Sequence, residues 1–369
     1  MKTNRIISFL MLHSLLGFTA FAAAPFDCGS TGAYGPMNIT NDTTLLLPPD
    51  GVFHCTTIAV AQGATLRFNR NALNTPVYLL ATENVKIDGT IDISANDRQG
   101  GPGGFDGGHP GSPYVGHEQG GDGYGPGGGT AGGITWGRFA GIYGNLLLVP
   151  LIGGSGSSPW NGSPWGYGWR SLGGGGAIMI AASTMITING AVQARGGTWD
   201  CTSYPHLSGS GGAVRLVAPV VGGTGAVDVS SNCARENSNG RIRIDCHDNQ
   251  AYRSLNLAGV ASRGSRMIVF PAVIPALDII EVGGQPIAEG TNSAVTIELA
   301  VGAPTSQTVR VQARNFTNDV PIRVVIMPEN GPSGSFDAVI LQASGNPPST
   351  NVPVIIPAGS VCQIHAWTR

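Results

Sequence analysis

The chain has 369 residues, of which 57 are glycine; 41% of the residues are hydrophobic, only 11% are charged, and the formal net charge is −2 at pH 7. The high hydrophobic content and low charge exclude a charge-rich disordered chain. The abundance of glycine and proline argues against a mainly helical protein, and the lack of excess positive charge argues against a nucleic-acid-binding protein.

Residues 1–24 have the pattern of a secretory signal. Lys2 and Arg5 precede an apolar run, and Ala20 and Ala22 supply small residues for cleavage. No later run of apolar residues is long enough for a membrane span. We therefore expect an exported chain that is secreted, extracellular or at the cell surface, with the periplasm as the alternative location.

A sequence repeat dominates residues 25–270. Residues 77–93 and 178–194 align without gaps, residues 214–229 form a third copy, and partial copies begin at 58 and 240. Each copy alternates apolar and polar residues with glycine at the corners, which is the periodicity of short strands. Because one copy is too small to bury its own apolar face, the copies must stack. The pattern predicts an all-β fold with a parallel β-helix, or solenoid, over 25–270; a sandwich of β-hairpins is the rival interpretation.

Residues 96–172 interrupt this repeat as a long insertion. The insertion holds almost half of the glycines and Trp136, Trp160, Trp165 and Trp169. A structureless loop of this length is rare inside a compact domain, and the aromatic residues favour an ordered excursion over a flexible linker. The apolar stretch 146–152 is predicted to dock the insertion on the β-helix.

The composition changes again at about residue 271, where the glycine clusters end. Alternating segments separated by turn signals predict a C-terminal, immunoglobulin-like β-sandwich over 271–369. The expected strands are 294–301, 308–316, 321–327, 336–342, 352–356 and 361–368.

Six cysteines in an exported chain indicate disulfides. Cys28 and Cys55 both lie in the N-terminal segment, so we expect them to pair. Cys201 and Cys233 follow equivalent strands of neighbouring copies, whose rungs would lie ~4.8 Å apart, within reach of a disulfide.

The remaining cysteines, Cys246 and Cys362, leave alternatives open. With His247 and His365 they offer zinc ligands, but the spacing matches no common zinc pattern. A disulfide between them, or two free thiols, is the favoured interpretation.

Several glycine-rich phrases resemble a group of exported bacterial proteins that have no assigned activity. These phrases are NALNTPVYLLA (71–81), GPGGFDGG (101–108), GSGGAVRLVAP (209–219) and GRIRID (240–245). The resemblance covers most of the chain that follows the signal. It implies export and a β-helix followed by a sandwich-like C-terminal domain, and it carries no functional residues.

The aromatic cluster of the insertion is the best candidate for ligand binding. Trp160, Trp165, Tyr167 and Trp169 lie within ten residues, and Trp136 precedes them. Flat rings of this kind suit the faces of sugars, whereas the structural alternative is that they pack onto the β-helix. We expect a structural or adhesive surface or matrix protein that binds an extended glycan. The expected partners are a polysaccharide or surface glycan and, through the C-terminal domain, other surface proteins.

A polysaccharide-degrading enzyme, either a lyase or a glycoside hydrolase, is the alternative function. Its candidate catalytic groups are Asp106, Glu118, Asp122 and His117, because glycoside hydrolysis usually needs two carboxylates. Residues 117, 118 and 122 could also hold a Ca²⁺ ion. Solvated loop carboxylates are the simpler interpretation, so the predicted function requires neither catalysis nor a cofactor.

Overall fold

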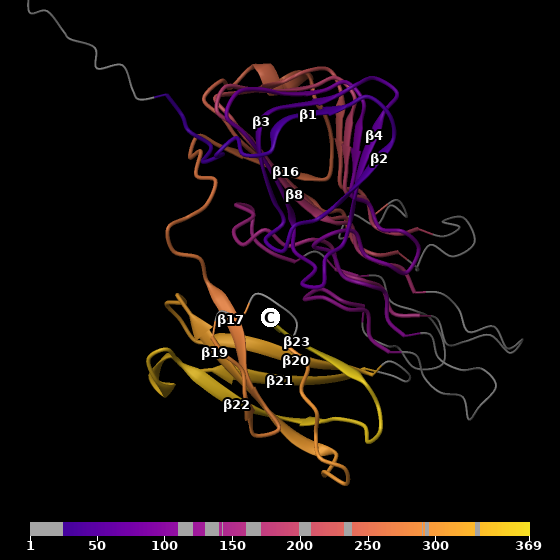
Figure 1. The fold of residues 1–369 in the computed structure, drawn as a ribbon, viewed down its shortest axis with the longest axis vertical. Helices are drawn as coiled ribbons and strands as arrows, with labels where there is room; N and C mark the ends of the chain where they lie inside the picture. The colour runs from indigo at the N-terminus through magenta and orange to yellow at the C-terminus, as the bar shows by residue number, and fades with distance from the viewer. Residues whose placement is uncertain are drawn as a thin grey trace, which may run out of the picture.

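The computed structural model describes residues 25–109, 121–129, 140–141, 143–159, 171–198, 208–231, 238–289, 291, 295–328 and 333–369. Within these ranges the chain is all-β, with two short 3-10 helices (Figure 1). Parallel strands occupy the first part of the chain and antiparallel strands the second part. None of the described helices is long and apolar enough to cross a membrane.

The parallel strands form three rows, which we call the three-row stack. Row A contains β3 (Val52–Val60), β5 (Val77–Ala81), β8 (Ala177–Ala182), β11 (Ala213–Val217), β14 (Arg241–Asp245) and β16 (Val260–Gly264). Row B contains β1 (Gly35–Ile39), the second half of β3, β6 (Val85–Ile87), β9 (Met185–Ile188) and β12 (Val220–Gly222). Row C contains β2 (Thr43–Leu46), β4 (Thr65–Asn69), β7 (Thr90–Asp92), β10 (Ala191–Gln193), β13 (Ala226–Asp228) and β15 (Asn256–Ala258). The 3-10 helix η1 (Ala251–Ser254) lies beside β12.

The register of these strands confirms the sequence repeat. Val77 lies opposite Ile178, and Ile178 in turn lies opposite Val214. Thr90 lies opposite Ala191, which lies opposite Ala226. Each of the three full copies therefore contributes one strand to each row, and equivalent residues stack on one another.

Apolar side chains from all three rows fill the space between them. Leu79, Ile180 and Leu216 from row A, Ile186 from row B and Val192 from row C are fully buried in one continuous cluster. Period-two alternation places these residues inside the stack, and burial of apolar surface is the main stabilising term for such a core.

The predicted disulfide between Cys28 and Cys55 is wrong. Both residues are buried free thiols that lie on opposite faces of row A. Cys55 belongs to the interior cluster, where burial raises the pKa of its thiol to about 11. Cys28 packs on the outer face and contacts the carbonyl oxygen of Ala81 at 3.0 Å. A strand therefore separates the two sulfur atoms. Cys246 and Cys362 are also free thiols, and Cys201 and Cys233 lie outside the described residues.

The outer face of row A is covered by the linker that leaves the stack. Val269 is buried against this face, and the ring of Phe270 lies 5.4 Å from that of Tyr78. Arg215 donates from Nη2 to the carbonyl oxygen of Ile268 at 2.6 Å and pairs with Asp245 at 3.1 Å. These contacts fix the direction in which the chain leaves the stack.

The C-terminal unit consists of two antiparallel sheets (orange to yellow in Figure 1). One sheet has the order β18 (Gln285–Pro286), β17 (Ala276–Val282), β19 (Ser306–Arg314) and β22 (Ser349–Ile355). The other has the order β21 (Gly334–Ile340), β20 (Val320–Pro328) and β23 (Cys362–Thr368), and η2 (Gln342–Ser344) follows β21. Side chains of both sheets meet in one apolar core that includes Val309, Val311, Ile322 and Val324.

One predicted strand of this unit, 294–301, is wrong. Residues 295–300 form no strand, although Ile297 and Leu299 still pack against the core. Alternation alone therefore does not make a strand where no neighbouring segment supplies hydrogen bonds. The first strand, β17, is an element that the sequence pattern missed, because a register irregularity between Ile279 and Glu281 breaks its alternation.

Candidate binding site

The described part of the insertion packs together with the glycine runs that precede β8 and β11. We call this assembly the glycine bundle; it comprises residues 100–108, 121–129, 151–157, 171–176, 194–198 and 208–212. Nearly all of its residues lack regular strand assignment, yet its segments are joined by backbone hydrogen bonds. The insertion is thus an ordered part of the fold over its described residues.

Consecutive N–H groups of one segment donate to different neighbouring segments. The N–H groups of Gly153, Gly154 and Gly156 donate to the carbonyl oxygens of residues 103, 175 and 124 at 2.7–3.0 Å. Those of Gly174 and Gly175 donate to residues 105 and 210. Successive N–H groups along one segment thus point toward different neighbours. Each segment can therefore bond to several neighbours at once, unlike a strand in a flat sheet.

The segments approach so closely that only glycine fits at many positions. A Cβ atom added to Gly174 would lie 2.0 Å from the carbonyl oxygen of Gly154, and one added to Gly156 would lie 1.9 Å from that of Asp106. Backbone atoms thus occupy the space that side chains fill elsewhere. At these described positions the packing therefore requires glycine.

Small polar side chains complete the hydrogen bonding inside the bundle. Ser155 and Ser157 are fully buried, and their hydroxyl oxygens accept from the N–H groups of Gly127 and Leu172 at 3.0 and 2.9 Å. Ser171 donates to the carbonyl oxygen of Gly108. Because buried backbone groups must be paired, these serines stabilise segments that have no ladder of their own.

Five segments of the sequence lie between described parts of the glycine bundle and its continuation along the stack: 110–120, 130–139, 160–170, 199–207 and 232–237. We call the described residues that flank each segment its base. The described residues at these points are connected: Gly121 donates to His109 at 2.9 Å, and Gly108 donates to Ser157, just before the third segment, at 2.9 Å. Ala140 donates to Ser208 at 3.3 Å, and Gly211 donates to Ser238 at 2.8 Å. Gly129 donates to the carbonyl oxygen of Gly156 at 3.1 Å and so links the second base to the third. These contacts bring the bases of all five segments close to one another.

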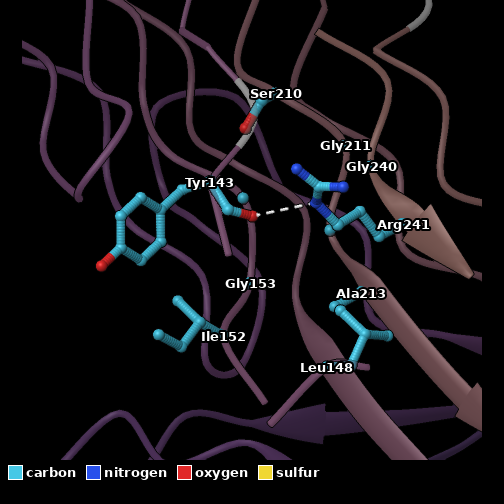
Figure 2. A pocket seen from close by; sticks show the side chains of 11 residues that line it. Tyr143, Leu148, Ile152, Gly153, Ser210, Gly211, Ala213, Gly240 and Arg241 are labelled. Atoms are coloured by element: carbon cyan, nitrogen blue, oxygen red, sulfur yellow. Dashed lines mark hydrogen bonds between the residues drawn. The ribbon is translucent and has the colours of Figure 1, made fainter. Parts of the chain in front are cut away.

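The stretch 143–152 attaches the bundle to the outer face of row A, as its apolar sequence predicted. Leu148 and Leu151 are buried there against Met179 and Val217. Figure 2 shows Arg241, at the start of β14, donating from Nε to the carbonyl oxygen of Tyr143 at 3.3 Å. The hollow lined by Tyr143, Leu148 and Arg241 has a volume of only about 10 Å³, room for about one water molecule.

A second and much larger cavity, of about 1060 Å³, lies between the glycine bundle, the turn at 70–76 and the C-terminal unit. Beside it, Trp367 from β23 packs edge-on against Phe105 of the bundle, with ring centroids 5.7 Å apart. Tyr124, Val325 and Met327 complete this apolar contact. The bundle and the C-terminal unit are therefore held together at the wall of the cavity.

An ion pair between Arg70 and Asp106 forms part of this wall. Asp106 also accepts from the N–H of Gly100 at 2.8 Å, and Arg70 donates from Nε to Asn74 at 2.9 Å. His365 lies nearby, where burial and, to a lesser extent, the positive charge of Arg70 lower the pKa of its imidazole. The side chain of Asp106 thus has a structural partner on each side, and His365 favours its neutral form.

Of the predicted catalytic residues, the structure describes Asp106 and Asp122. Asp106 lines the cavity, whereas Asp122 lies next to Ser335 of the C-terminal unit at 3.4 Å. His117 and Glu118 lie outside the described residues, as do the predicted sugar-binding residues Trp136, Trp160, Trp165, Tyr167 and Trp169. No group of three potential metal ligands occurs among the residues that the structure describes.

Apart from Asp106, sequence reasoning missed the residues that form the cavity. Arg70, Phe105 and Trp367 come from three distant parts of the chain, and no local motif marks them. The glycine runs before β8 and β11 were the available signal for the bundle, because a run of four glycines is unfavourable in an ordinary strand.

Comparisons of the chain with protein-family models, with curated proteins and with solved structures find no match.

Proposed function

We propose that this is an exported structural or adhesive protein that binds an extended glycan through aromatic residues of the insertion, namely Trp136, Trp160, Trp165, Tyr167 and Trp169. In this proposal the three-row stack is a parallel β-helix, and the C-terminal unit is an immunoglobulin-like sandwich that contacts other surface proteins. Membership of the glycine-rich exported group remains a prediction from the sequence phrases.

The proposal rests mainly on the observation that the bases of the five segments lie close to one another. The sequences of these five segments contain five of the six tryptophans of the chain: Trp136, Trp160, Trp165, Trp169 and Trp199. The sixth, Trp367, is buried in the contact between the bundle and the C-terminal unit. Exposure of the large apolar ring of tryptophan to water is unfavourable, and tryptophan is enriched at binding surfaces. The number of tryptophans in segments whose bases are neighbours therefore supports a ligand-binding role.

The close packing of the scaffold supports the same role. Binding groups work best when they are carried by rigid elements, because less conformational entropy is lost when the ligand binds. The glycine bundle provides such elements through its hydrogen bonds between neighbouring segments. A glycan is the favoured ligand because the five segments carry few charged side chains but many aromatic and small polar ones.

Affinity electrophoresis tests this proposal. The protein is run in gels that contain cellulose derivatives, xylan, mannan, chitosan or alginate, and the gels are then stained for polysaccharide. We expect one or more of these polymers to retard the protein without a cleared track. The triple variant Trp160→Ala, Trp165→Ala, Trp169→Ala is expected to lose at least about tenfold in affinity, or ~1.4 kcal/mol.

The matched control is Tyr34→Ala, which removes an exposed aromatic ring directly before β1. This variant should be retarded as strongly as the unchanged protein. Equal retardation of the folded triple variant would contradict the assignment of the site. A cleared track would instead indicate an enzyme that acts on the polymer.

A further inference from the structure

We propose that the cavity between the glycine bundle and the C-terminal unit is a second binding site, which takes an uncharged oligosaccharide. The choice of ligand class rests on the proposed glycan-binding function. None of the described residues that line the cavity belongs to the segment that carries Trp160, Trp165 and Trp169.

The first support is the size and position of the cavity. Its volume of about 1060 Å³ is at the upper end of the range for ligand sites, ~300–1,000 Å³. Ligand sites also occur preferentially between domains. This cavity lies between the edge of the three-row stack, the glycine bundle and the C-terminal unit, so a short chain of sugars fits better than a single one.

The second support is that the walls are fixed to each other. Trp367 packs on Phe105, Tyr143 contacts the hydroxyl of Thr368, and Ser335 lies 3.4 Å from Asp122. Each of these contacts joins the C-terminal unit to the bundle or to the stretch that follows it. A cavity between fixed walls persists without a ligand, which lowers the entropic cost of binding.

The third support is the charge of the lining. The only oppositely charged side chains in the described wall, Arg70 and Asp106, pair with each other. His365 favours its neutral form, since burial lowers its pKa. The wall therefore has no unpaired charge for an anionic or cationic ligand, and a charged sugar would lose hydration there without a partner.

The fourth support is the kind of polar group that remains. The side chains of Gln99 and Gln363 are exposed to the cavity, and their amide N–H groups donate to no described residue. Amides both donate and accept, as sugar hydroxyl groups require. The half-buried rings of Phe105, Tyr143 and Phe316 supply apolar surface beside them. An uncharged sugar chain presents apolar ring faces and hydroxyl groups in alternation, which match the aromatic rings and the amides of the wall.

Isothermal titration calorimetry on the full chain tests this site with cellotriose, chitotriose, maltotriose and mannotriose, and with trigalacturonate as the charged comparison. At least one uncharged trisaccharide is expected to bind with a dissociation constant of roughly 1 mM or tighter. Trigalacturonate is expected to bind at least tenfold more weakly.

Two variants locate the binding. Ala72 is an exposed residue of the wall, so Ala72→Trp places a large ring at the cavity without removing a buried contact. It should weaken binding at least tenfold, and Gln363→Ala should weaken it severalfold. The control Leu46→Trp, in β2, changes a side chain that is 77% exposed and does not line the cavity, so it should bind as the unchanged protein does.

The triple tryptophan variant separates this proposal from the proposed function. Trisaccharide binding that survives in the triple variant but is lost in Ala72→Trp supports the cavity site, even if no polymer retards the protein. Binding that is lost in the triple variant but unchanged in Ala72→Trp overturns it. The absence of binding by every uncharged trisaccharide, or preferential binding of trigalacturonate, also overturns it.

Discussion

The three-row stack and the glycine bundle are built from the same turns of chain, but they are packed in different ways. Residues 173–176 belong to the bundle and lead directly into β8, and residues 209–212 lead directly into β11. In the stack, side chains such as Ile180 and Leu216 fill the interior. In the bundle, backbone fills the interior and side chains are almost absent.

This difference shows that order does not require an apolar core in every part of a fold. The stack is stabilised by removal of apolar surface from water. The bundle depends on hydrogen bonds between segments and on close van der Waals contact of backbone atoms. The two regions should therefore respond in opposite ways to changes of side-chain size: the stack is sensitive to loss of volume, and the bundle to its addition.

The largest effect is expected from loss of volume in the stack. Ile180 is fully buried between Leu79 and Leu216 of the neighbouring strands. Ile180→Ala should lower the free energy of unfolding by about 2–5 kcal/mol, through lost burial and the cavity that remains. Urea unfolding followed by circular dichroism measures this change.

The control for this prediction is Met185→Ala in β9, because the side chain of Met185 is 43% exposed. We expect it to change stability by less than about 1 kcal/mol. Equal effects of the two variants would show that the stack does not have the close-packed interior described above.

Addition of a single carbon atom should be the damaging change in the bundle. At Gly174 a Cβ atom would lie 2.0 Å from a backbone oxygen, so Gly174→Ala should destabilise the protein by about 1–3 kcal/mol or more. At Gly141 the nearest atom would be 3.7 Å away, which is ordinary contact. Gly141→Ala is the matched control and should be close to neutral in the same urea titration.

The sequence could predict the stack in detail but could not predict the bundle. In the stack the apolar period of two and the repeat of Val77 at Ile178 and Val214 are local signals, and they set the observed register. In the bundle Gly154 donates to the carbonyl oxygen of Gly175 and accepts from the N–H of Phe105, and no repeat relates these two partners to each other. Glycine also has no side chain whose pattern could reveal which face is buried.

The same reasoning explains the errors at the cysteines and at the cavity. Cys28 and Cys55 are close in sequence, but alternation in β3 places Cys55 inside the stack, whereas Cys28 lies in an irregular segment before β1 that packs on the other face of row A. The cavity wall combines Arg70, Asp106 and His365 from three regions. Its composition depends on how the C-terminal unit docks, which local patterns do not determine.

The smallest predicted effect concerns the pH dependence of stability at the contact between the bundle and the C-terminal unit. Burial lowers the pKa of His365 in the folded state below its value of about 6.5 in the unfolded chain. The unfolded state therefore binds the proton more readily, and stability falls as the pH drops below about 6.5. His365→Gln removes this contribution, so the loss of melting temperature between pH 7.5 and pH 5 should become smaller.

The control is His247→Gln, which replaces an exposed histidine that follows β14. The two variants are compared by differential scanning fluorimetry at both pH values. An unchanged pH dependence in His365→Gln would mean that His365 is not held in its neutral form by the contact.

Hydrogen–deuterium exchange of the free protein tests most directly whether the glycine bundle is a rigid scaffold. The four N–H groups of residues 173–176 all donate to other segments, whereas residues 295–300 of the C-terminal unit lie in no strand. We predict that amides 173–176 exchange as slowly as those of β8, which follows them, and far more slowly than amides 295–300. Exchange of 173–176 as fast as that of 295–300 would contradict the scaffold and, with it, the binding role built upon it.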